Sequence, residues 1–249
     1  MDLGLTGKKA LVLGASRGLG AASATLLAAE GAQVIAASRS GTAPAEGMQA
    51  MALDLSDAAS VDALIAWLGD NPVDILVANC GGPAAGPARG QTTAAWAAAF
   101  DTMAAPIFAI ADAALPGMIA GGWGRIVTIG SSGIVQPIPN LALSNTVRGA
   151  VAGWSKTLAE EVAPHGITVN MVLPGRIATD RLAQLDGIKA DKTGASLEQV
   201  QDASRKTIPA GRYGRPEEFG AMVTFLCSQQ AGYVTGAMMR VDGGMIRGL

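Results

Sequence analysis

Three glycines near the start of the chain have a spacing suited to holding a phosphate. Gly14, Gly18 and Gly20 follow the apolar run 10–13 and precede an alanine-rich run over 21–31. That order predicts a strand, a tight loop and a helix. Glycine lets the backbone turn where a Cβ would clash, and the free N–H groups that open a helix attract an anion. We therefore predict a dinucleotide pyrophosphate site, with a plain glycine turn as the alternative.

The other residue types with obvious chemistry do not form a metal or disulfide pattern. Cys80 and Cys227 are far apart and lack metal-ligand spacing. The one histidine, His165, lies between a proline and a glycine, which predicts a surface turn rather than a catalytic base. We therefore expect no bound metal and no disulfide framework.

The composition limits the class of protein. The chain has 249 residues, 49% of them hydrophobic, and a formal net charge of −2. We expect a single domain over residues 1–249 with one large core. The charge gives no reason to expect nucleic acid as a partner. Because the N-terminus lacks the form of a signal peptide and no apolar run reaches membrane-spanning length, we expect a soluble cytoplasmic protein with no membrane partner.

The elements that must position the glycine loop alternate along the chain. Besides 10–13, short apolar runs predict strands at 33–37, 48–53, 74–78, 125–129, 167–172 and 238–241. Helical patterns lie between them, at 57–68 with Ser56 as its cap, and at 93–120, 144–163 and 216–228. Pro106 predicts a kink in the second of these. The alternation predicts an α/β fold with a parallel sheet.

One polar segment breaks this alternation. Residues 180–211 follow a late strand and are rich in charged residues and glycine. Ligands of such sheets bind beyond the carboxyl ends of the strands. We therefore predict that residues 180–211 form a lid over a substrate, with a loose surface excursion as the alternative.

The ordered motifs resemble those of one family. They are the glycine loop, residues 76–81, 124–127 and 166–170, Pro174-Gly175, and residues 241–244. Together they resemble the short-chain dehydrogenase/reductase family, especially its 3-oxoacyl-carrier-protein reductase-like members. The resemblance covers nearly the whole chain. It implies a three-layer Rossmann fold with a seven-stranded parallel sheet, three helices on each face, and a homotetramer or homodimer.

The resemblance also implies a nicotinamide cofactor. Ser38 replaces the acidic residue with which NAD-preferring relatives bind the ribose, and Arg39 and Arg17 stand nearby. Two guanidinium groups favour a 2′-phosphate, so we predict NADP(H) over NAD(H). The alternative is that both are solvated surface arginines. The remaining cofactor contacts implied are Gly14, Ser16, Gly18, Leu19, Gly20, Asp54, Leu55, Asn79, Gly81, Arg148, Pro174, Gly175, Ile177 and Thr179.

The chain departs from the resemblance at the catalytic positions. The family uses an asparagine, a serine, a tyrosine and a lysine. Ser131 matches the serine, but Ser144 stands at the tyrosine position, Arg148 at the lysine position and Met103 at the asparagine position. A serine hydroxyl is far less acidic than a phenol, and arginine stays protonated. We therefore expect Ser144 and Arg148 to donate hydrogen bonds and stabilise charge, without acting as a general acid.

Three functions follow from these residues. The first is an NADP(H)-dependent reductase in which Ser131, Ser144 and Arg148 act on a small-molecule substrate that needs little acid catalysis, such as an activated carbonyl, an imine or an enone. The main alternative is a catalytically silent NADPH-binding sensor or scaffold. A non-redox lyase similar to halohydrin dehalogenases is a third interpretation, weakened because those proteins keep the tyrosine and lack the glycine loop.

Overall fold

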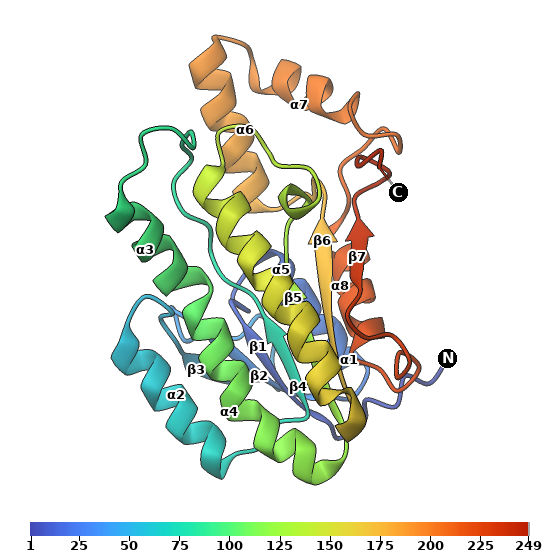
Figure 1. Cartoon of the computed structure of the whole chain (residues 1–249). Helices are drawn as coiled ribbons and strands as arrows, with labels where there is room; N and C mark the ends of the chain where they lie inside the picture. Colours follow the sequence, from blue (N-terminus) through green and yellow to red (C-terminus); the bar gives the residue numbers. More distant parts are fainter. Residues whose placement is uncertain (249) are drawn as a thin grey trace.

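A computed structural model describes residues 1–248 and shows one seven-stranded parallel sheet between two layers of helices (Figure 1). The strand order is β3-β2-β1-β4-β5-β6-β7. The strands are β1 (Lys9–Leu13), β2 (Gln33–Ser38), β3 (Gln49–Ala52), β4 (Ile75–Ala78), β5 (Gly124–Ile129), β6 (Ile167–Pro174) and β7 (Met238–Val241). The predicted α/β class and parallel sheet are confirmed.

The central strands are mostly apolar because helices cover both faces of the sheet. Every residue of β4 and β5 is buried, including the side chain of Arg125. The strand order changes direction between β1 and β4, where Val12 pairs with Val77. The carboxyl ends of these two strands therefore diverge at a switch point, which is where α/β sheets bind their ligands.

The two helical layers are unequal. One apolar core joins the sheet to α2 (Ala58–Asp70), α4 (Ala105–Gly121) and α5 (Ala142–Val162). A second core joins the other face to α1 (Gly18–Ala29) and α8 (Pro216–Leu226). In the described part of the chain this second face therefore carries two long helices, and the expected three per face is wrong there.

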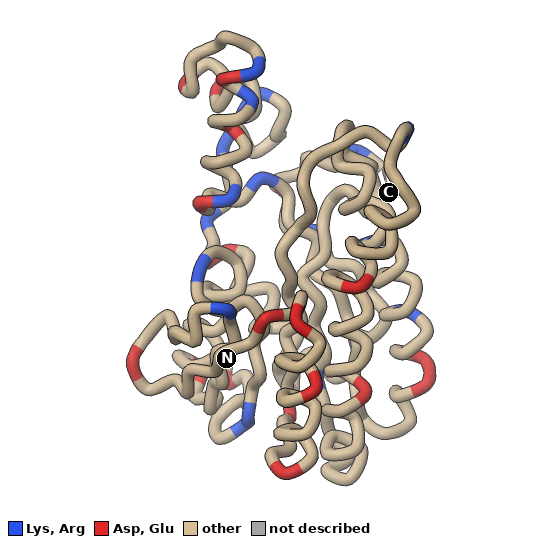
Figure 2. The backbone as a smooth tube through the Cα atoms, turned by 90° about the vertical axis from the view of Figure 1, so that its left-hand side faces the viewer, with Lys and Arg blue, Asp and Glu red and all other residues tan. Residues whose placement is uncertain are grey.

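The segment 180–211 is more regular than its composition suggested. It contains α6 (Asp180–Thr193) and α7 (Leu197–Arg205), which rise above the carboxyl ends of the strands (Figure 1). Figure 2 shows positions of basic and of acidic residues along the backbone of this projection. Ser196 begins α7 with a capping box, which explains why a polar stretch forms a helix here.

Two boundaries predicted from the sequence are wrong. Asp57, not Ser56, caps α2, because its side chain accepts a hydrogen bond from the Ala59 N–H at 3.1 Å. The helix expected over 93–120 is divided at Ala104 into α3 (Thr93–Met103) and α4. Pro106 lies in the first turn of α4, where its missing N–H costs no hydrogen bond, so the predicted kink is a break between helices.

The expectation about apolar length is also corrected. The helical stretch Thr93–Gly121 has 29 residues, and its most apolar 18-residue window has a mean hydropathy of 1.6, so by length and composition alone it could cross a membrane. Half of its most apolar window is buried inside the protein. Ile107, Ile110 and Met118 pack in the main core, so this apolar character is explained by burial against the sheet.

Candidate functional site

The glycine loop between β1 and α1 leaves its backbone open to a ligand. Gly14 and Gly18 have φ of +63° and +59°, which L side chains rarely adopt. A Cβ on Gly20 would lie 2.3 Å from the Gly14 carbonyl oxygen. Arg17 is the N-cap of α1 and makes no side-chain cap, so no side chain of the cap occupies the first N–H groups. The loop therefore fits a phosphate-bearing dinucleotide.

The end of β4 lies against this loop. The Asn79 amide nitrogen donates to the Gly14 carbonyl oxygen at 3.4 Å. A Cβ added to Gly14 would lie only 2.6 Å from this Asn79 nitrogen, so the loop and Asn79 are closely packed. The side chain of Asn79, at the end of β4, thus bridges to the glycine loop. Gly81 follows as an exposed residue.

The adenosine side predicted from the sequence lies at the ends of β2 and β3. Ser38 is buried and its hydroxyl lies 3.2 Å from that of Ser40, while Arg39 is exposed. Asp54 accepts hydrogen bonds from the Ser56 hydroxyl at 2.6 Å and the Ser56 N–H at 2.9 Å. These bonds hold the pKa of Asp54 below its ordinary value, with a smaller contribution from the charge of Arg39. Arg39 and the residues after β3 therefore share one electrostatic environment.

The segment after β6 reaches over the glycine loop. Gly175 lies so close to the end of β7 that a Cβ would come within 2.6 Å of the Asp242 Cα. Ile177 is buried and forms an isolated β-bridge with Gly214. Thr179 caps α6, and its methyl group would lie 3.6 Å from a Cβ on Gly18. The start of the lid therefore lies beside the loop predicted to hold the pyrophosphate. Of the other predicted contacts, Ser16, Leu19, Leu55 and Pro174 are half-buried.

The two predicted serines lie on elements that follow β5. Ser131 begins the short helix η1 (Ser132–Ile134), and its oxygen accepts a hydrogen bond from the Gly133 N–H at 3.0 Å. Its own O–H remains available as a donor. Ser144 lies in the first turn of α5, is half-buried, and makes no side-chain hydrogen bond within residues 1–248. Both hydroxyls can therefore donate to a ligand oxygen.

Sequence reasoning missed Asn145. Its amide donates to the Ile138 carbonyl oxygen at 2.9 Å and accepts from the Ile138 N–H at 3.4 Å. A Cβ on Gly133 would lie 2.4 Å from the Asn145 Oδ1. Asn145 thus holds the loop between η1 and α5 beside Ser131. The only sequence signal was an amide next to Ser144, which does not reveal this partner.

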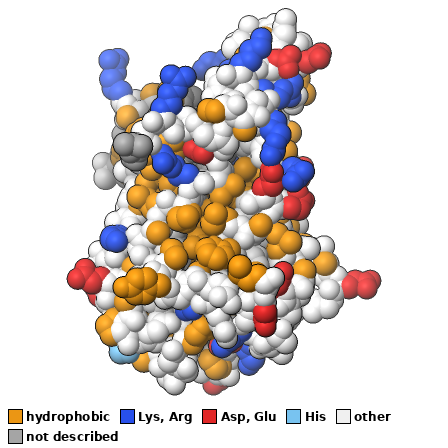
Figure 3. All heavy atoms as spheres, turned by 90° about the vertical axis from the view of Figure 1, so that its right-hand side faces the viewer, with side chains coloured by type: hydrophobic (Ala, Val, Ile, Leu, Met, Phe, Trp, Pro, Cys, Tyr) orange, Lys and Arg blue, Asp and Glu red, His pale blue; other side chains and the backbone are white. Residues whose placement is uncertain are grey.

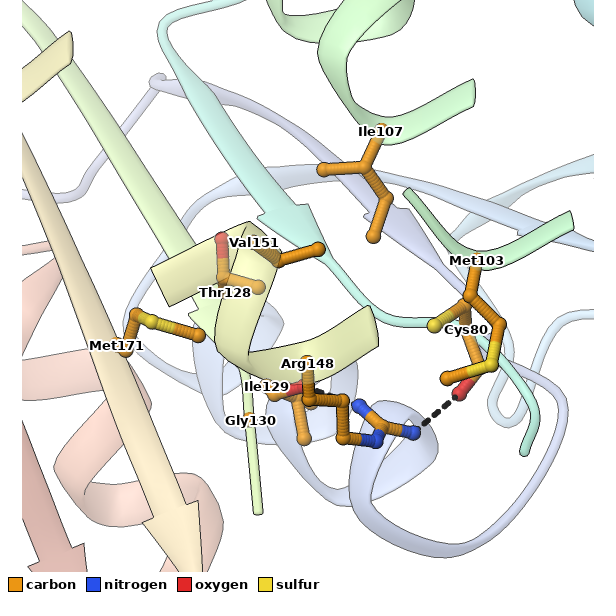
Figure 4. Close-up of a pocket in the computed structure, with 9 residues that line it drawn as sticks. All are labelled: Cys80, Met103, Ile107, Thr128, Ile129, Gly130, Arg148, Val151 and Met171. Carbon is orange, nitrogen blue, oxygen red and sulfur yellow. Dashed lines mark hydrogen bonds between the residues drawn. The ribbon is translucent and has the colours of Figure 1, made fainter. Parts of the chain in front are cut away.

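Arg148 makes contacts that the sequence did not predict. One guanidinium nitrogen donates to the Ile129 carbonyl oxygen at 3.1 Å. The other donates to the carbonyl oxygens of Cys80 and Gly81, each at 3.4 Å (Figure 4). The side chain therefore points from α5 onto the ends of β4 and β5.

A small apolar cavity of about 10 Å³ lies behind this guanidinium (Figure 4). Met103, from the end of α3, lines it and is 3% exposed. Thr128 also lines it, and its hydroxyl is buried without a hydrogen-bond partner. Cys80 lies at the same cavity, and burial raises the pKa of its thiol.

Neither tyrosine is bonded to these groups. The Tyr213 hydroxyl donates to the Asp186 carboxylate of α6 at 2.7 Å. Burial and this hydrogen bond raise the pKa of Tyr213. Tyr233 is fully exposed. His165 is exposed in the turn before β6, as predicted. Among residues 1–248, no three His, Cys, Asp or Glu side chains gather as a metal site would require.

Comparisons with known proteins agree on one group of enzymes. A family model described as enoyl-(acyl carrier protein) reductase matches residues 14–246. The 3-oxoacyl-[acyl-carrier-protein] reductase FabG of Vibrio cholerae is 37% identical, covering 98% of this chain and 99% of its own length. The FabG of Escherichia coli is 38% identical, covering 96% and 97%.

Solved structures show the same likeness. L-sorbose reductase from Gluconobacter frateurii, complexed with NADPH and L-sorbose, matches with a TM-score of 0.92 at 29% identity and covers 100% of each chain. YwfH, an NADPH-dependent reductase involved in bacilysin biosynthesis, matches with a TM-score of 0.90 at 26% identity, covering 98% of this chain and 100% of its own.

Proposed function

This chain belongs to the short-chain dehydrogenase/reductase family, and from that premise we propose that it is an NADP(H)-dependent oxidoreductase. The observation that carries the proposal is the uncapped start of α1 behind Gly14, Gly18 and Gly20. Its backbone N–H groups suit a pyrophosphate. The NADPH-bound sorbose reductase and the NADPH-dependent YwfH support the choice of cofactor.

We assign the adenosine phosphate to Arg39 and Arg17. Both side chains are exposed, and the neighbouring Ser38 adds no charge. A guanidinium binds a phosphate through charge-assisted hydrogen bonds, whereas a carboxylate at this place would repel it. Asn79 and Gly81 would lie beside the adenosine half, and the segment from Pro174 to Thr179 would hold the nicotinamide half.

The active site that we propose uses Ser131, Ser144 and Arg148. The bound nicotinamide supplies the hydride. The two serine hydroxyls donate to the oxygen of the acceptor and orient it. The positive charge of Arg148 would stabilise the negative charge that develops on this oxygen. In other enzymes, removing one donor that stabilises such an oxyanion costs about 3–4 kcal/mol.

The substrate class follows from the absence of a phenol at position 144. A positioned general acid typically contributes about 10²–10⁴-fold. Simple ketones, which need that proton, should therefore be poor substrates. Activated carbonyls, imines and conjugated enones should be better. We further propose that the protein acts in the cytoplasm.

The test is an NADPH titration followed by a panel of these acceptors. Protein fluorescence or calorimetry measures binding, and loss of absorbance at the reduced nicotinamide measures turnover. Ser131→Ala and Ser144→Ala should each lower turnover without abolishing NADPH binding. Thr146→Ala, an exposed position on α5, is the matched control.

Two outcomes would change the assignment. Tight NADPH binding with no turnover across the panel would favour the sensor or scaffold interpretation. No binding of either nicotinamide dinucleotide would overturn the proposal as a whole.

We also propose that the chain assembles as a homodimer or homotetramer. β7 is an edge strand, and Met238 on it is 48% exposed. Figure 3 shows hydrophobic side chains gathered on the face that carries the end of the sheet. An open edge beside an apolar face favours pairing with a second copy.

A further inference from the structure

We propose that Arg148 is a positioning residue that ties together the segments leaving β4 and β5. We call these the β4 exit (residues 79–81) and the β5 exit (residues 129–131). The consequence for cofactor and acceptor rests on the proposed function, but the tie itself does not. It concerns backbone contacts that are present without any ligand.

Arg148 supplies hydrogen bonds to backbone carbonyls beyond the point where the β4–β5 ladder ends. The ladder between β4 and β5 ends at the pair Ala78 and Thr128. Beyond it, Arg148 donates to Ile129 at 3.1 Å and to Cys80 and Gly81 at 3.4 Å. A half-buried carbonyl without a donor is costly, so these bonds hold both exits in place.

The shape of the Arg148 side chain suits it to bind both exits. A guanidinium is a planar fork with five N–H donors, and it can reach several acceptors at once. An ammonium is a compact charge on a flexible stem. Lysine at position 148 would keep the positive charge but lose the simultaneous bonds to the two exits. The tie therefore depends on the fork, and the charge alone would not supply it.

Each exit contains a residue of the proposed site. The β4 exit begins with Asn79, whose amide donates to Gly14 in the glycine loop at 3.4 Å. The β5 exit ends with Ser131, which begins η1. By fixing both exits, Arg148 sets how the glycine loop faces the serine. We infer that it aligns the two halves of the proposed site.

The apolar cavity behind the guanidinium gives a way to observe the tie. Its volume is about 10 Å³, and Met103, Thr128 and Cys80 are among its lining residues. Without the fork, solvent would gain access past position 148. The thiol of Cys80 would then react faster. The other cysteine, Cys227, is fully buried and burial raises its pKa to about 12, so we expect it not to react with a thiol reagent.

The experiment compares Arg148→Lys and Arg148→Met in the ligand-free protein, with the labelling rate of Cys80 by a disulfide reagent as the readout. Arg148→Lys, which keeps a positive charge near the thiol, should label at least about tenfold faster than the wild type, the equivalent of one charge-assisted hydrogen bond. Arg148→Met should label more slowly than Arg148→Lys, because the charge of Arg148 lowers the pKa of Cys80 and its loss leaves less of the reactive thiolate. Cys80→Ala gives the background. Lys156→Met, on the outer side of the same helix, is the control. If Arg148→Lys labels at the wild-type rate, charge and not the fork carries the role, and the proposal is overturned.

A second readout separates positioning from general stability. NADPH affinity is measured in Arg148→Lys, in Asn79→Ala and in the double variant. If Arg148 acts through the β4 exit, the loss caused by Arg148→Lys should shrink at least about threefold once Asn79 is removed. Additive losses would contradict that route. A wild type that binds no NADPH would defeat the proposed function, while the labelling comparison would still decide whether the tie exists.

Discussion

At the scale of single residues, Arg39 decides the expected cofactor preference. Its exposed guanidinium follows Ser38, the last residue of β2, which stands at the position that the resemblance assigns to a ribose-binding carboxylate in NAD-preferring relatives. Arg39→Asp should weaken NADPH binding by roughly 10–100-fold, because a charge-assisted hydrogen bond is worth about 1.5–3 kcal/mol. NADH binding should be unchanged or improved. The ratio of the two dissociation constants checks this, and an unchanged ratio would remove Arg39 from the site.

Ser144 decides whether the site has a general acid. Its hydroxyl is half-buried and makes no hydrogen bond within the described residues, so a ligand can reach it. Ser144→Tyr should raise turnover of a simple ketone, by up to about 10²–10⁴-fold if the phenol is well placed. Ser144→Phe supplies the same bulk without the hydroxyl. Equal rates for the two variants would show that proton delivery is not what limits ketone reduction.

At the scale of elements, the segment 180–211, which we predict to be a lid, is anchored by a buried carboxylate. Asp186 of α6 has a side chain only 2% exposed, between Arg176 Nη1 at 3.0 Å and the Tyr213 hydroxyl at 2.7 Å. Arg176 precedes α6 and Tyr213 precedes α8, so the carboxylate joins three segments. Removing one partner of a buried charge leaves the other uncompensated.

Tyr213→Phe should therefore destabilise the closed lid by about 1.5–3 kcal/mol, because the hydroxyl donates to a charged acceptor. Hydrogen exchange along α6 should become faster, while the core strands keep their protection. Tyr233→Phe is the control, since Tyr233 is fully exposed. Unchanged exchange in α6 would show that the lid is held by other contacts.

The start of α8 has a pH-dependent ion pair. Arg212 donates to both carboxylate oxygens of Glu218, at 2.7 and 2.8 Å, and lowers the Glu218 pKa from 4.5 to about 2. A depressed acid stabilises the fold above its unfolded pKa, and this contribution disappears as the pH falls through the folded value. The window is therefore pH 4.5 down to about 2.

Glu218→Gln should lose less thermal stability than the wild type between those pH values. Thermal midpoints measured across the window test this, with Glu217→Gln as the neighbouring control. The difference should be small, because the pair is exposed to solvent. Parallel pH profiles for wild type and Glu218→Gln would contradict the assignment.

At the scale of the whole molecule, the open edge of the sheet should be covered by a second copy. Met238 lies on the edge strand β7, and the neighbouring face is apolar (Figure 3). Met238→Lys should shift the protein toward the monomer, because a charged edge opposes strand pairing. Sedimentation or light scattering measures the mass, and the exposed Ile119→Lys on α4 is the comparison. A monomeric wild type would refute the proposed assembly.

Much of the fold is determined by local sequence patterns. Strand β7 occupies the predicted residues 238–241, and the other strands differ from their predicted limits by a few residues. Such runs can be recognised because a strand covered on both faces is mostly apolar. The glycine loop could also be predicted from the sequence, because the positive φ angles of Gly14 and Gly18 favour glycine at those positions. The NADP(H) prediction, made from Ser38, Arg39 and Arg17, agrees with the NADPH-bound structural relative.

Only the tertiary structure decided which partners the polar side chains take. Arg148 bonds to Cys80, which lies 68 residues earlier, and Tyr213 bonds to Asp186 across 27 residues. The sequence shows that position 148 is an arginine, but it does not show that the guanidinium donates hydrogen bonds to backbone carbonyl oxygens. It also hid the break at Ala104 and the bridge from Asn145 to Ile138. The physical reason is range: periodicity and turn propensity act between near neighbours, whereas these bonds depend on how strands and helices are packed.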